Sequence, residues 1–538
     1  MSRRWDAAYP PESRWDAAIT PGTLPGFLDD VAARFANNPA IEYRGHVLDY
    51  AQVKQAADRL AAGLMAQGLG RGDCVALYLP NTAWHPICFF AVLRTGARVV
   101  HLSALDAKRE LAHKAQDAGA SLLITTGHGS LVANAAWLRE TGAVARVLLA
   151  PEARWGGEDA AQDFSELPEA DPPTAWPAIA REDIALLQYT GGTTGTPKGA
   201  MLSHGNMTAA IAIYAAWRDS TSLPAGTARV LVALPLFHIF ALTAVLLRQF
   251  AEGSLCHLRG RFDAAQWVAD VERLRITTFS GVPTMWIAIA GLPGIAARDL
   301  SSLRQCSSGG APMPFEVQGR VEQIIGQRIG GGWGMTETCP AGTRLPPDAP
   351  RRAGLIGLPL PRVDLRVVSL DDPTREMPVG EIGEIAVRGA NVFTGYWNRP
   401  AENAAAFVDG WFLTGDNGWM DERGFFTLVD RRKNMILSGG FNVYPAQIEQ
   451  AIYEHPAVAE CIVIGVPDVY RGQAAKAYVA LKPGAAALTL DALRGFLADR
   501  LGKHELPSAL EIRESLPRSA AGKLLASALR NELRQQED

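Results

Sequence analysis

A loop rich in glycine and threonine holds the residue types that bind phosphate. Between Gln188 and Gly199 the chain reads Tyr189-Thr190-Gly191-Gly192-Thr193-Thr194-Gly195-Thr196-Pro197-Lys198, and the apolar residues 184–187 before it predict a buried strand. Glycine lets backbone N–H groups approach an anion, threonine adds hydroxyl donors, and lysine adds a positive charge. We therefore predict that this loop binds the phosphates of a nucleotide.

This loop differs from the common phosphate loop of NTPases. In that pattern a Ser or Thr beside the lysine binds Mg²⁺, whereas Gly199 follows Lys198 here. The metal ligand must therefore come from elsewhere in the chain. The difference argues against a motor, a GTPase or a simple kinase.

Three other segments carry candidate chemical groups. Glu337 ends a glycine-rich turn, and its carboxylate suits Mg²⁺, although a lone glutamate is more often a surface charge. His238 lies in an apolar run, where a histidine is usually part of the core. Lys523 lies near the C-terminus, where a lysine is nearly always solvated.

Taken in order, these motifs resemble those of the AMP-forming adenylating enzymes, which include acyl-CoA synthetases, peptide-synthetase adenylation domains and luciferases. The loop and the following residues 198–204 are most similar to bacterial medium- and long-chain fatty acyl-CoA ligases. The resemblance extends from about residue 25 to about residue 530.

The resemblance implies a role for each motif in the first reaction. It places ATP phosphates on the loop, Mg²⁺ on Glu337, the acyl carboxylate near His238, and Lys523 at the charge that develops during adenylation. Backbone along the adenine and acyl pockets is implied for Gly309, Gly310, Ala311, Gly332 and Gly334, adenine stacking for Trp333, α-phosphate binding for Thr336, and ribose binding for Asp416 and Arg431.

The C-terminal part is implied to move. By resemblance, Lys433 is the hinge, and Gly439, Gly440 and Phe441 belong to the loop that serves the thioester step. Departures from the family pattern occur at Trp333 (usually Tyr), Asn434 (usually acidic), Glu505 (often Lys) and Ala526-Ser527 (usually an Arg pair). The changes at Glu505 and Ala526-Ser527 affect the expected contacts with CoA phosphates, so they bear on the thioester step more than on adenylation.

The implied activity is a two-step ligase reaction with ATP, Mg²⁺ and coenzyme A. A fatty acid would form acyl-AMP and pyrophosphate, and CoA would then take the acyl group. Ligases for dicarboxylic or aryl acids are the alternative within the class, and transfer to a carrier protein is disfavoured because no insertion lies at the domain junction. A nonenzymatic acyl or nucleotide sensor is disfavoured because Lys198, Glu337, Asp416, Arg431 and Lys523 are all retained.

Composition fits a large protein of the cytoplasm. The 538 residues exceed one ordinary core, and the net charge of -4 without a basic patch argues against nucleic acid. The six cysteines lack paired spacing, which indicates reduced thiols. Residues 230–247 are nearly all apolar, but Pro235 and His238 interrupt them, so a buried strand, turn and helix fit better than a membrane span. Peripheral membrane association, and a monomer or a homodimer, stay open.

The apolar pattern predicts an α/β fold in two domains. Residues 52–65 show helical periodicity, residues 74–78 and 97–102 read as strands, and this alternation favours parallel layers. Residues 355–432 favour short strands of a β-rich subdomain. We expect a large N-terminal domain over 1–432 and a small mobile α+β domain over 433–538. The pentapeptide Arg-Trp-Asp-Ala-Ala at residues 4–8 and 14–18 suggests an arm whose two Trp side chains dock on the body.

Overall fold

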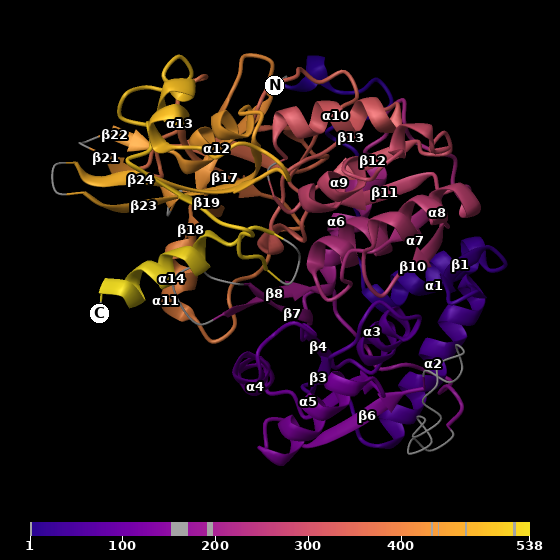
Figure 1. Ribbon diagram of the computed structural model, residues 1–538. Helices are drawn as coiled ribbons and strands as arrows, with labels where there is room; N and C mark the ends of the chain where they lie inside the picture. Colours follow the sequence, from indigo (N-terminus) through magenta and orange to yellow (C-terminus); the bar gives the residue numbers. More distant parts are fainter. Residues whose placement is uncertain are drawn as a thin grey trace.

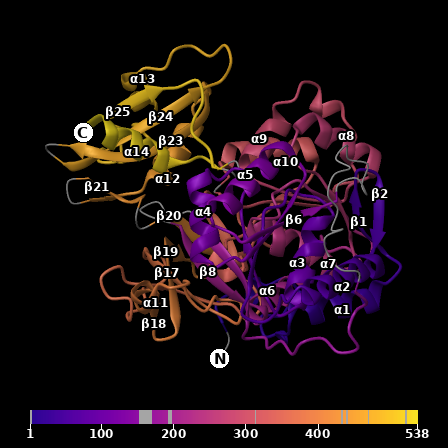
Figure 2. The same cartoon turned by 90° about the horizontal axis from the view of Figure 1, so that it is seen from below.

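The computed structural model describes residues 3–151, 170–190, 197–311, 313–431, 434–438, 441–468, 471–519 and 523–537. Within these residues the strands form four sheets. Figures 1 and 2 show the sheet of the C-terminal residues, β21–β25, in a lobe at one side of the molecule. The expected α/β class and its β-rich subdomain are confirmed. The predicted boundary at residue 432 falls between β20 and β21, and the hinge at Lys433 stays a prediction because that residue lies outside the described ranges.

The first sheet leads into the phosphate loop. Its order is β6-β5-β3-β4-β7-β8, parallel throughout except for the antiparallel pair β7 and β8. The apolar runs predicted as strands at residues 74–78, 97–102 and 184–187 are here, buried between helices. The strands are β3 Cys74–Leu77, β4 Arg98–His101, β5 Leu122–Thr126, β6 Arg146–Ala150, β7 Ile184–Thr190 and β8 Lys198–Ser203.

The second sheet has the order β13-β12-β11-β9-β10-β1-β2 and is parallel except for the pair β1 and β2. The carboxyl end of β12 leads directly into Gly309 and Gly310, so this edge of the sheet faces the candidate site. The strands are β1 Pro39–Tyr43, β2 His46–Asp49, β9 Arg229–Val232, β10 Leu255–Leu258, β11 Thr278–Gly281, β12 Gln305–Ser308 and β13 Ile329–Gly330.

Helices cover both parallel sheets, and local sequence sets their ends. The predicted helix is α2, which begins with a reciprocal capping box between Asp49 and Gln52 and is followed by Gly68 at φ +86. The helices are α1 Leu24–Phe35, α2 Tyr50–Ala66, α3 Trp84–Arg94, α4 Lys108–Asp117, α5 Gly129–Glu140, α6 His204–Ala216, α7 Arg248–Ala251, α8 Ala264–Leu274, α9 Pro283–Ala290 and α10 Phe315–Ile325, with 3₁₀ turns at Asp6–Ala8, Ile295–Ala297 and Thr336–Thr338.

The apolar segment at residues 230–247 is a buried strand, a turn and a buried helix, as predicted. The strand is β9, and the helix Phe240–Leu247 has π-type hydrogen bonding before it continues into α7. Short π segments often occur at functional sites, and this one follows His238 directly. Among the described residues, no helix is long and apolar enough to cross a membrane.

The β-rich subdomain is an antiparallel sheet with the order β14-β15-β20-β19-β17-β16, and β18 pairs with β19. It carries Asp416 on β19, opposite Arg431 on β20. Its elements are β14 Thr343–Arg344, β15 Leu355–Pro359, β16 Asp364–Val368, β17 Gly383–Arg388, α11 Pro400–Ala406, β18 Phe407–Val408, β19 Trp411–Met420 and β20 Phe426–Arg431.

The C-terminal lobe has a small sheet of its own, with the order β22-β21-β24-β23 and β25 paired in parallel to β24. Its long pair, β23 and β24, includes the apolar runs at residues 459–466 and 475–481. Its elements are β21 Ile436–Ser438, β22 Phe441–Val443, α12 Pro445–Tyr453, β23 Val458–Asp468, β24 Gly472–Leu481, α13 Leu490–Leu497, β25 Ala509–Ile512 and α14 Ala526–Glu537.

The N-terminal arm docks on the body through its tryptophans, as expected. Trp5 and Trp15 are buried, at 7% and 8% exposure. The Trp15 indole donates to the carbonyl of Val363 at 3.0 Å, and Trp5 packs against Phe426. Ser13 meanwhile exchanges two hydrogen bonds with the backbone of Arg218. The arm therefore joins the β-rich subdomain to the second sheet's layer.

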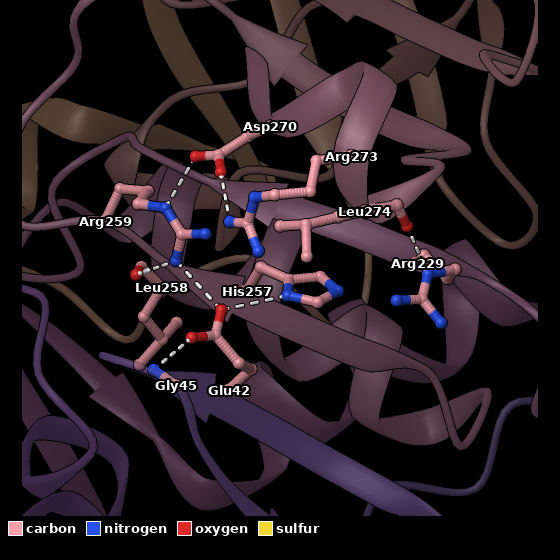
Figure 3. A network of polar contacts seen from close by, with 9 residues as sticks. All are labelled: Glu42, Gly45, Arg229, His257, Leu258, Arg259, Asp270, Arg273 and Leu274. Atoms are coloured by element: carbon pink, nitrogen blue, oxygen red, sulfur yellow. Dashed lines mark hydrogen bonds and ion pairs between the residues drawn. The ribbon is translucent and has the colours of Figure 1, made fainter. Parts of the chain in front are cut away.

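A buried ionic network ties the second sheet to α8 (Figure 3). Glu42 on β1 accepts from His257 on β10 at 3.0 Å and from Arg259 at 2.9 Å, and Arg259 also donates to Asp270 on α8 at 2.7 Å. Arg273 completes the chain by donating to Asp270 at 2.8 Å. Each buried carboxylate thus has a cationic partner, which its burial requires.

Candidate active site

The β7–β8 hairpin holds both ends of the predicted phosphate loop. Tyr189 pairs with Gly199, and Thr190 pairs with Lys198. The Tyr189 hydroxyl donates to Asp117 at 2.5 Å, and burial and Asp117 together raise the tyrosine pKa. Residues Gly191, Gly192, Thr193, Thr194, Gly195 and Thr196 lie outside the described residues. The structure therefore gives the loop's anchors, and the loop's own contacts stay predictions.

The Tyr396 side chain brings two predicted site residues together. Its hydroxyl donates to Glu337 at 2.8 Å, and the ammonium of Lys198 lies 5.5 Å from the centre of its ring. Glu337 is 5% exposed, and burial and this carboxylate raise the pKa of Tyr396. Lys198 also lies 3.7 Å from Glu402. Tyr396, which no sequence motif pointed to, thus joins the metal candidate to the phosphate lysine.

Glu337 fits a bound magnesium ion that is completed by a nucleotide. Within the described residues, no cluster of three or more His, Cys, Asp or Glu side chains could hold a metal by itself. Mg²⁺ is commonly bound by one or two carboxylates together with substrate phosphates. A single buried carboxylate that shares Tyr396 as a neighbour with Lys198, the predicted phosphate lysine, suits that arrangement.

Glycines of the second motif lie where backbone segments come too close for a side chain. A Cβ on Gly334 would lie 1.4 Å from the carbonyl oxygen of Pro340, and one on Gly332 would lie 2.1 Å from that of Thr343. Asn391 fixes the following turn by donating to the carbonyls of Thr338 and Ala341 at 2.8 and 2.6 Å. Thr336 and Glu337 begin this 3₁₀ turn, so the tight packing sets their positions.

Trp333 is tied directly to the predicted ribose carboxylate. Its indole N–H donates to Asp416 at 2.7 Å, and both side chains are buried. The missing tyrosine hydroxyl is thus replaced by a different polar contact. Arg431 faces Asp416 across the β19–β20 pair, but its side chain lies outside the described residues.

A small cavity beside His238 is lined by residues of both the N-terminal part and the C-terminal lobe. Its lining includes Pro235, His238, Phe240, Gly310 and Lys523. A side-chain carbon at Gly310, where φ is +77, would lie 2.9 Å from Cε of Lys523, and one at Gly309 would lie 2.6 Å from the ring of Phe240. The small residues therefore leave room for the lysine and the aromatic ring. Ala311 follows Gly310 in the chain, and Pro197 follows the predicted phosphate loop.

His238 is neutral at physiological pH. Burial, and then the nearby charge of Lys523, lower its pKa to about 3. Its Nδ1 accepts from the backbone N–H of Phe240 at 3.2 Å, which leaves Nε2 as the protonated nitrogen of the neutral ring. The imidazole can therefore donate one hydrogen bond without carrying charge.

Two amides that sequence reasoning missed hold the His238 turn. Gln188 on β7 donates to the carbonyl of Phe237 at 3.1 Å. Asn81 donates to the carbonyl of Leu234 and accepts from the N–H of Leu236, both at 2.8 Å. Gln188 begins the phosphate-loop stretch and Asn81 follows a strand, but neither position signals a contact with the His238 turn, so only the fold reveals it.

Phe441, the described member of the predicted thioester loop, is not among the residues that line the His238 cavity. Phe441 is 57% exposed, and its ring lies 4.7 Å from that of His504. Lys433, Gly439 and Gly440 lie outside the described residues. The departures have local partners: Glu505 accepts from the N–H of Gly502 at 2.7 Å, and Asn434 donates to Asp430 and accepts from Arg530.

The fold and the site define the class. This chain belongs to the AMP-binding enzyme family: the model of that family matches residues 28–397, and the model of the AMP-binding enzyme C-terminal domain matches residues 447–523.

Individual proteins of known name or structure are also similar to this chain. A long-chain-fatty-acid–CoA ligase of Bacillus subtilis is 36% identical over 98% of both chains. A feruloyl-CoA synthase of Amycolatopsis sp is 39% identical over 91% of this chain and 95% of its own. Among solved structures, ATP-bound MatB from Rhodopseudomonas palustris has a TM-score of 0.85 at 28% identity, with 96% of this chain and all of that one covered, whereas its apo form has 0.76. The expected class, an ATP-dependent acid–thiol ligase that forms acyl-CoA, is confirmed.

Proposed function

We propose that this protein activates long-chain fatty acids as acyl-CoA thioesters. The observation that carries the proposal is the meeting of Lys523 with His238 and Gly310 in one cavity. It brings a cation of the C-terminal lobe to the turn that the sequence assigns to the acyl carboxylate. The name of the Bacillus subtilis relative, which this chain matches over nearly its full length, supports a long acyl chain.

In the first step, a carboxylate oxygen bonds to the α-phosphorus of ATP, and the bond to pyrophosphate breaks. No base is needed, because the acid reacts as its anion; charge neutralisation and positioning lower the barrier. Lys198, Thr193 and Thr194 would hold the phosphates, Thr336 the α-phosphate, and Lys523 the charge that develops between acid and phosphate. Mg²⁺ on Glu337, when bound, supplies further neutralisation of the triphosphate.

The nucleoside and the acid would lie on either side of the reacting α-phosphate. Trp333 stacks on adenine while Asp416 and Arg431 bind the ribose. Gly309, Gly310 and Ala311 pass between adenine and acyl chain. His238 donates a hydrogen bond toward the carboxylate and, being neutral, does not compete with Lys523 for its charge.

For the second step, we propose that residues 433–538 rotate about Lys433 relative to residues 1–432. Lys523 then leaves, and Gly439, Gly440 and Phe441 replace it beside the adenylate. The CoA thiolate attacks the acyl carbon and AMP departs. The largely exposed Phe441 fits a segment that gains further contacts in the second arrangement. We further propose a cytoplasmic enzyme that contacts membranes peripherally, as a monomer or homodimer.

The test is pyrophosphate release and thioester formation with MgATP and CoA. The acids are the saturated series from acetate to palmitate, together with benzoate and ferulate. Highest kcat/KM with a long monoacid, accompanied by AMP, supports the proposal. Turnover of benzoate or ferulate without turnover of the fatty acids would show that the protein is an aryl acid–CoA ligase. Pyrophosphate without thioester would point to an acceptor other than CoA, and no product with any acid would favour a sensor.

A further inference from the structure

Asp430 is a carboxylate of the large domain that accepts hydrogen bonds from the C-terminal lobe. It lies on β20, opposite Asn417 of β19, and is 6% exposed. Its oxygens accept from the backbone N–H of Ala446 at 2.9 Å and from the side-chain amide of Asn434 at 3.1 Å. Both donors follow residue 433, the predicted hinge, whereas Asp430 precedes it. These two hydrogen bonds therefore join one domain to the other.

The bond to Ala446 caps helix α12 from the large domain. Tyr444, the residue before the helix, makes no side-chain cap, and Pro445 at the first helical position has no N–H. The N–H of Ala446 is therefore the first donor at this helix end, where no carbonyl of the helix can accept from it. A carboxylate there also faces the positive end of the helix dipole. Asp430 thus stabilises α12 in its place against β20 (Figure 2).

Asn434 extends this contact to the last helix of the chain. Its amide nitrogen donates to Asp430, and its amide oxygen accepts from the guanidinium of Arg530 on α14 at 2.9 Å. A carboxylate only accepts and a guanidinium only donates, so the two partners fix the orientation of the amide. An acidic residue at position 434, as is usual in the family, could accept from Arg530 but would repel Asp430. Asparagine therefore permits a link that an acid would not.

The two helices held in this way share one sheet with Lys523. Successive residues of β23 face opposite sides of the sheet. Val463 belongs to the apolar cluster that includes Ile448 of α12. Ile464 belongs to the cluster that includes Leu529 of α14, and Lys523 lies just before α14 in the chain. Holding α12 and α14 against the large domain therefore also holds Lys523 in its cavity.

The proposed rotation of the lobe separates these partners. Ala446 and Arg530 move with the lobe, while Asp430 stays with β20. A hydrogen bond to a charged group shifts an equilibrium by roughly tenfold or more. The contacts of Asp430 therefore favour the arrangement in which Lys523 lines the cavity, and they must break before the second arrangement forms.

We propose that Asp430, Asn434 and Arg530 form a latch between the two domains. The latch positions Lys523 for adenylation and opens for the thioester step. This inference rests on the proposed function and adds three positioning residues to it, which act by setting the fraction of molecules in the first arrangement. Because the structure shows that arrangement, a weaker latch should reduce its population little and raise that of the second arrangement up to roughly tenfold.

The experiment measures both half-reactions in Asn434→Leu and Arg530→Met. Leucine has nearly the shape of asparagine without its hydrogen bonds, and methionine keeps much of the length of arginine without its charge. Thioester formation from supplied acyl-AMP and CoA should rise roughly three- to tenfold, whereas pyrophosphate release from MgATP and palmitate without CoA should fall less than about threefold. Asn434→Asp should change both rates in the same directions and by more, because it adds repulsion.

A distance measurement checks the populations directly. The cysteines at 74, 88, 256, 306, 339 and 461 are all buried, so spin labels can be attached selectively at Glu381→Cys in the large domain and Ala487→Cys in the lobe, both exposed positions. The Asn434→Leu and Arg530→Met variants should show more of the second interlabel distance than the unsubstituted latch. Unchanged distance distributions would contradict the latch.

Arg513→Met is the matched control. Arg513 pairs at 2.8 Å with Glu511 and with Glu532 of α14, so its loss removes charged contacts that stay within the lobe. It should leave the ratio of the two half-reactions unchanged. The double variant Asn434→Leu/Arg530→Met should behave like Asn434→Leu alone, because both changes act on one chain of bonds.

The half-reactions also separate a failure of the latch from a failure of the proposed function. Equal losses in both half-reactions of Asn434→Leu, or an unchanged ratio of the two rates, would overturn the latch while the proposed function stands. If the wild-type protein releases no pyrophosphate and forms no thioester with any acid, the proposed function fails and this inference fails with it.

Discussion

The indole N–H of Trp333 donates to the carboxylate of Asp416 at 2.7 Å. The first side chain lies in the loop after β13 of the second sheet and the second lies on β19 of the β-rich subdomain, so the bond links these two parts at the predicted nucleoside site. Trp333, one of the residues that differ from the family pattern, therefore donates to the carboxylate that is predicted to bind ribose. This relationship gives the first prediction.

Trp333→Phe should raise the KM for ATP by roughly tenfold, because the ring remains but Asp416 loses a hydrogen bond worth about 1.5 kcal/mol. The effect on kcat should be smaller, since the indole contacts the nucleoside side of the site. Initial-rate kinetics with varied ATP provide the measurement. An unchanged KM would show that the bond is only structural, and Trp419→Phe serves as a control on the same sheet.

Tyr396→Phe should increase the Mg²⁺ concentration needed for half-maximal pyrophosphate release. The hydroxyl donates to Glu337 and holds the carboxylate in one orientation, and loss of such an outer partner typically weakens metal binding by about 10-fold or more. Rates at saturating Mg²⁺ should approach those of the wild type. If the variant has the same Mg²⁺ dependence as the wild type, Glu337 does not act as the metal ligand.

The network in Figure 3 predicts a pH-dependent contribution to stability. Burial alone would raise the pKa of Glu42, but hydrogen bonds from His257, the backbone of Gly45 and Arg259 outweigh it and hold the pKa at about 2, below the usual 4.5. Because the folded pKa is depressed, the stabilisation is complete above pH 4.5 and is lost as pH falls toward 2.

Glu42→Gln should therefore lower the free energy of unfolding by about 3 kcal/mol at pH 7. The difference from wild type should shrink between pH 4 and pH 2. Urea denaturation of both proteins across this range gives the difference directly. If the difference in the free energy of unfolding stays constant down to pH 2, the packing of Glu42, and not its charge, stabilises the fold.

Trp15→Ala should destabilise the fold by about 3 kcal/mol, because it removes a buried ring and a hydrogen bond to Val363. Proteolysis near the β-rich subdomain should quicken, since the arm joins that sheet to the main body. Arg14→Ala is the control, because Arg14 is 79% exposed and pairs only with its neighbour Asp16 among described residues. Equal stability of both variants would contradict the role given to the arm.

Much of the fold could be predicted because its signals are local. The helix over residues 52–65, the apolar strands around Val75 and Leu186, and the docking of Trp5 and Trp15 were all expected from residue type and spacing. The glycine turn and the site role of His238 were expected through the family resemblance, whereas the contacts of the phosphate loop stay predictions because residues 191–196 lie outside the described ranges.

Contacts between distant segments were not predictable in this way. Tyr396 lies 59 residues from Glu337, and Gln188 reaches a carbonyl 49 residues away. Side chains that act by orienting others have no motif of their own, so the sequence alone does not reveal them.

The most direct test of the account separates the two half-reactions in Lys523→Ala. Lys523 reaches the His238 cavity from the C-terminal lobe, so its loss should reduce pyrophosphate release from MgATP and a fatty acid by at least about a hundredfold. Thioester formation from supplied acyl-AMP and CoA should stay within a few-fold of wild type. Lys482→Ala, an exposed lysine of the same lobe that donates to the carbonyl of Pro456, should leave both rates unchanged. Equal losses in the two half-reactions of Lys523→Ala would contradict the proposed division of labour between the two domain arrangements.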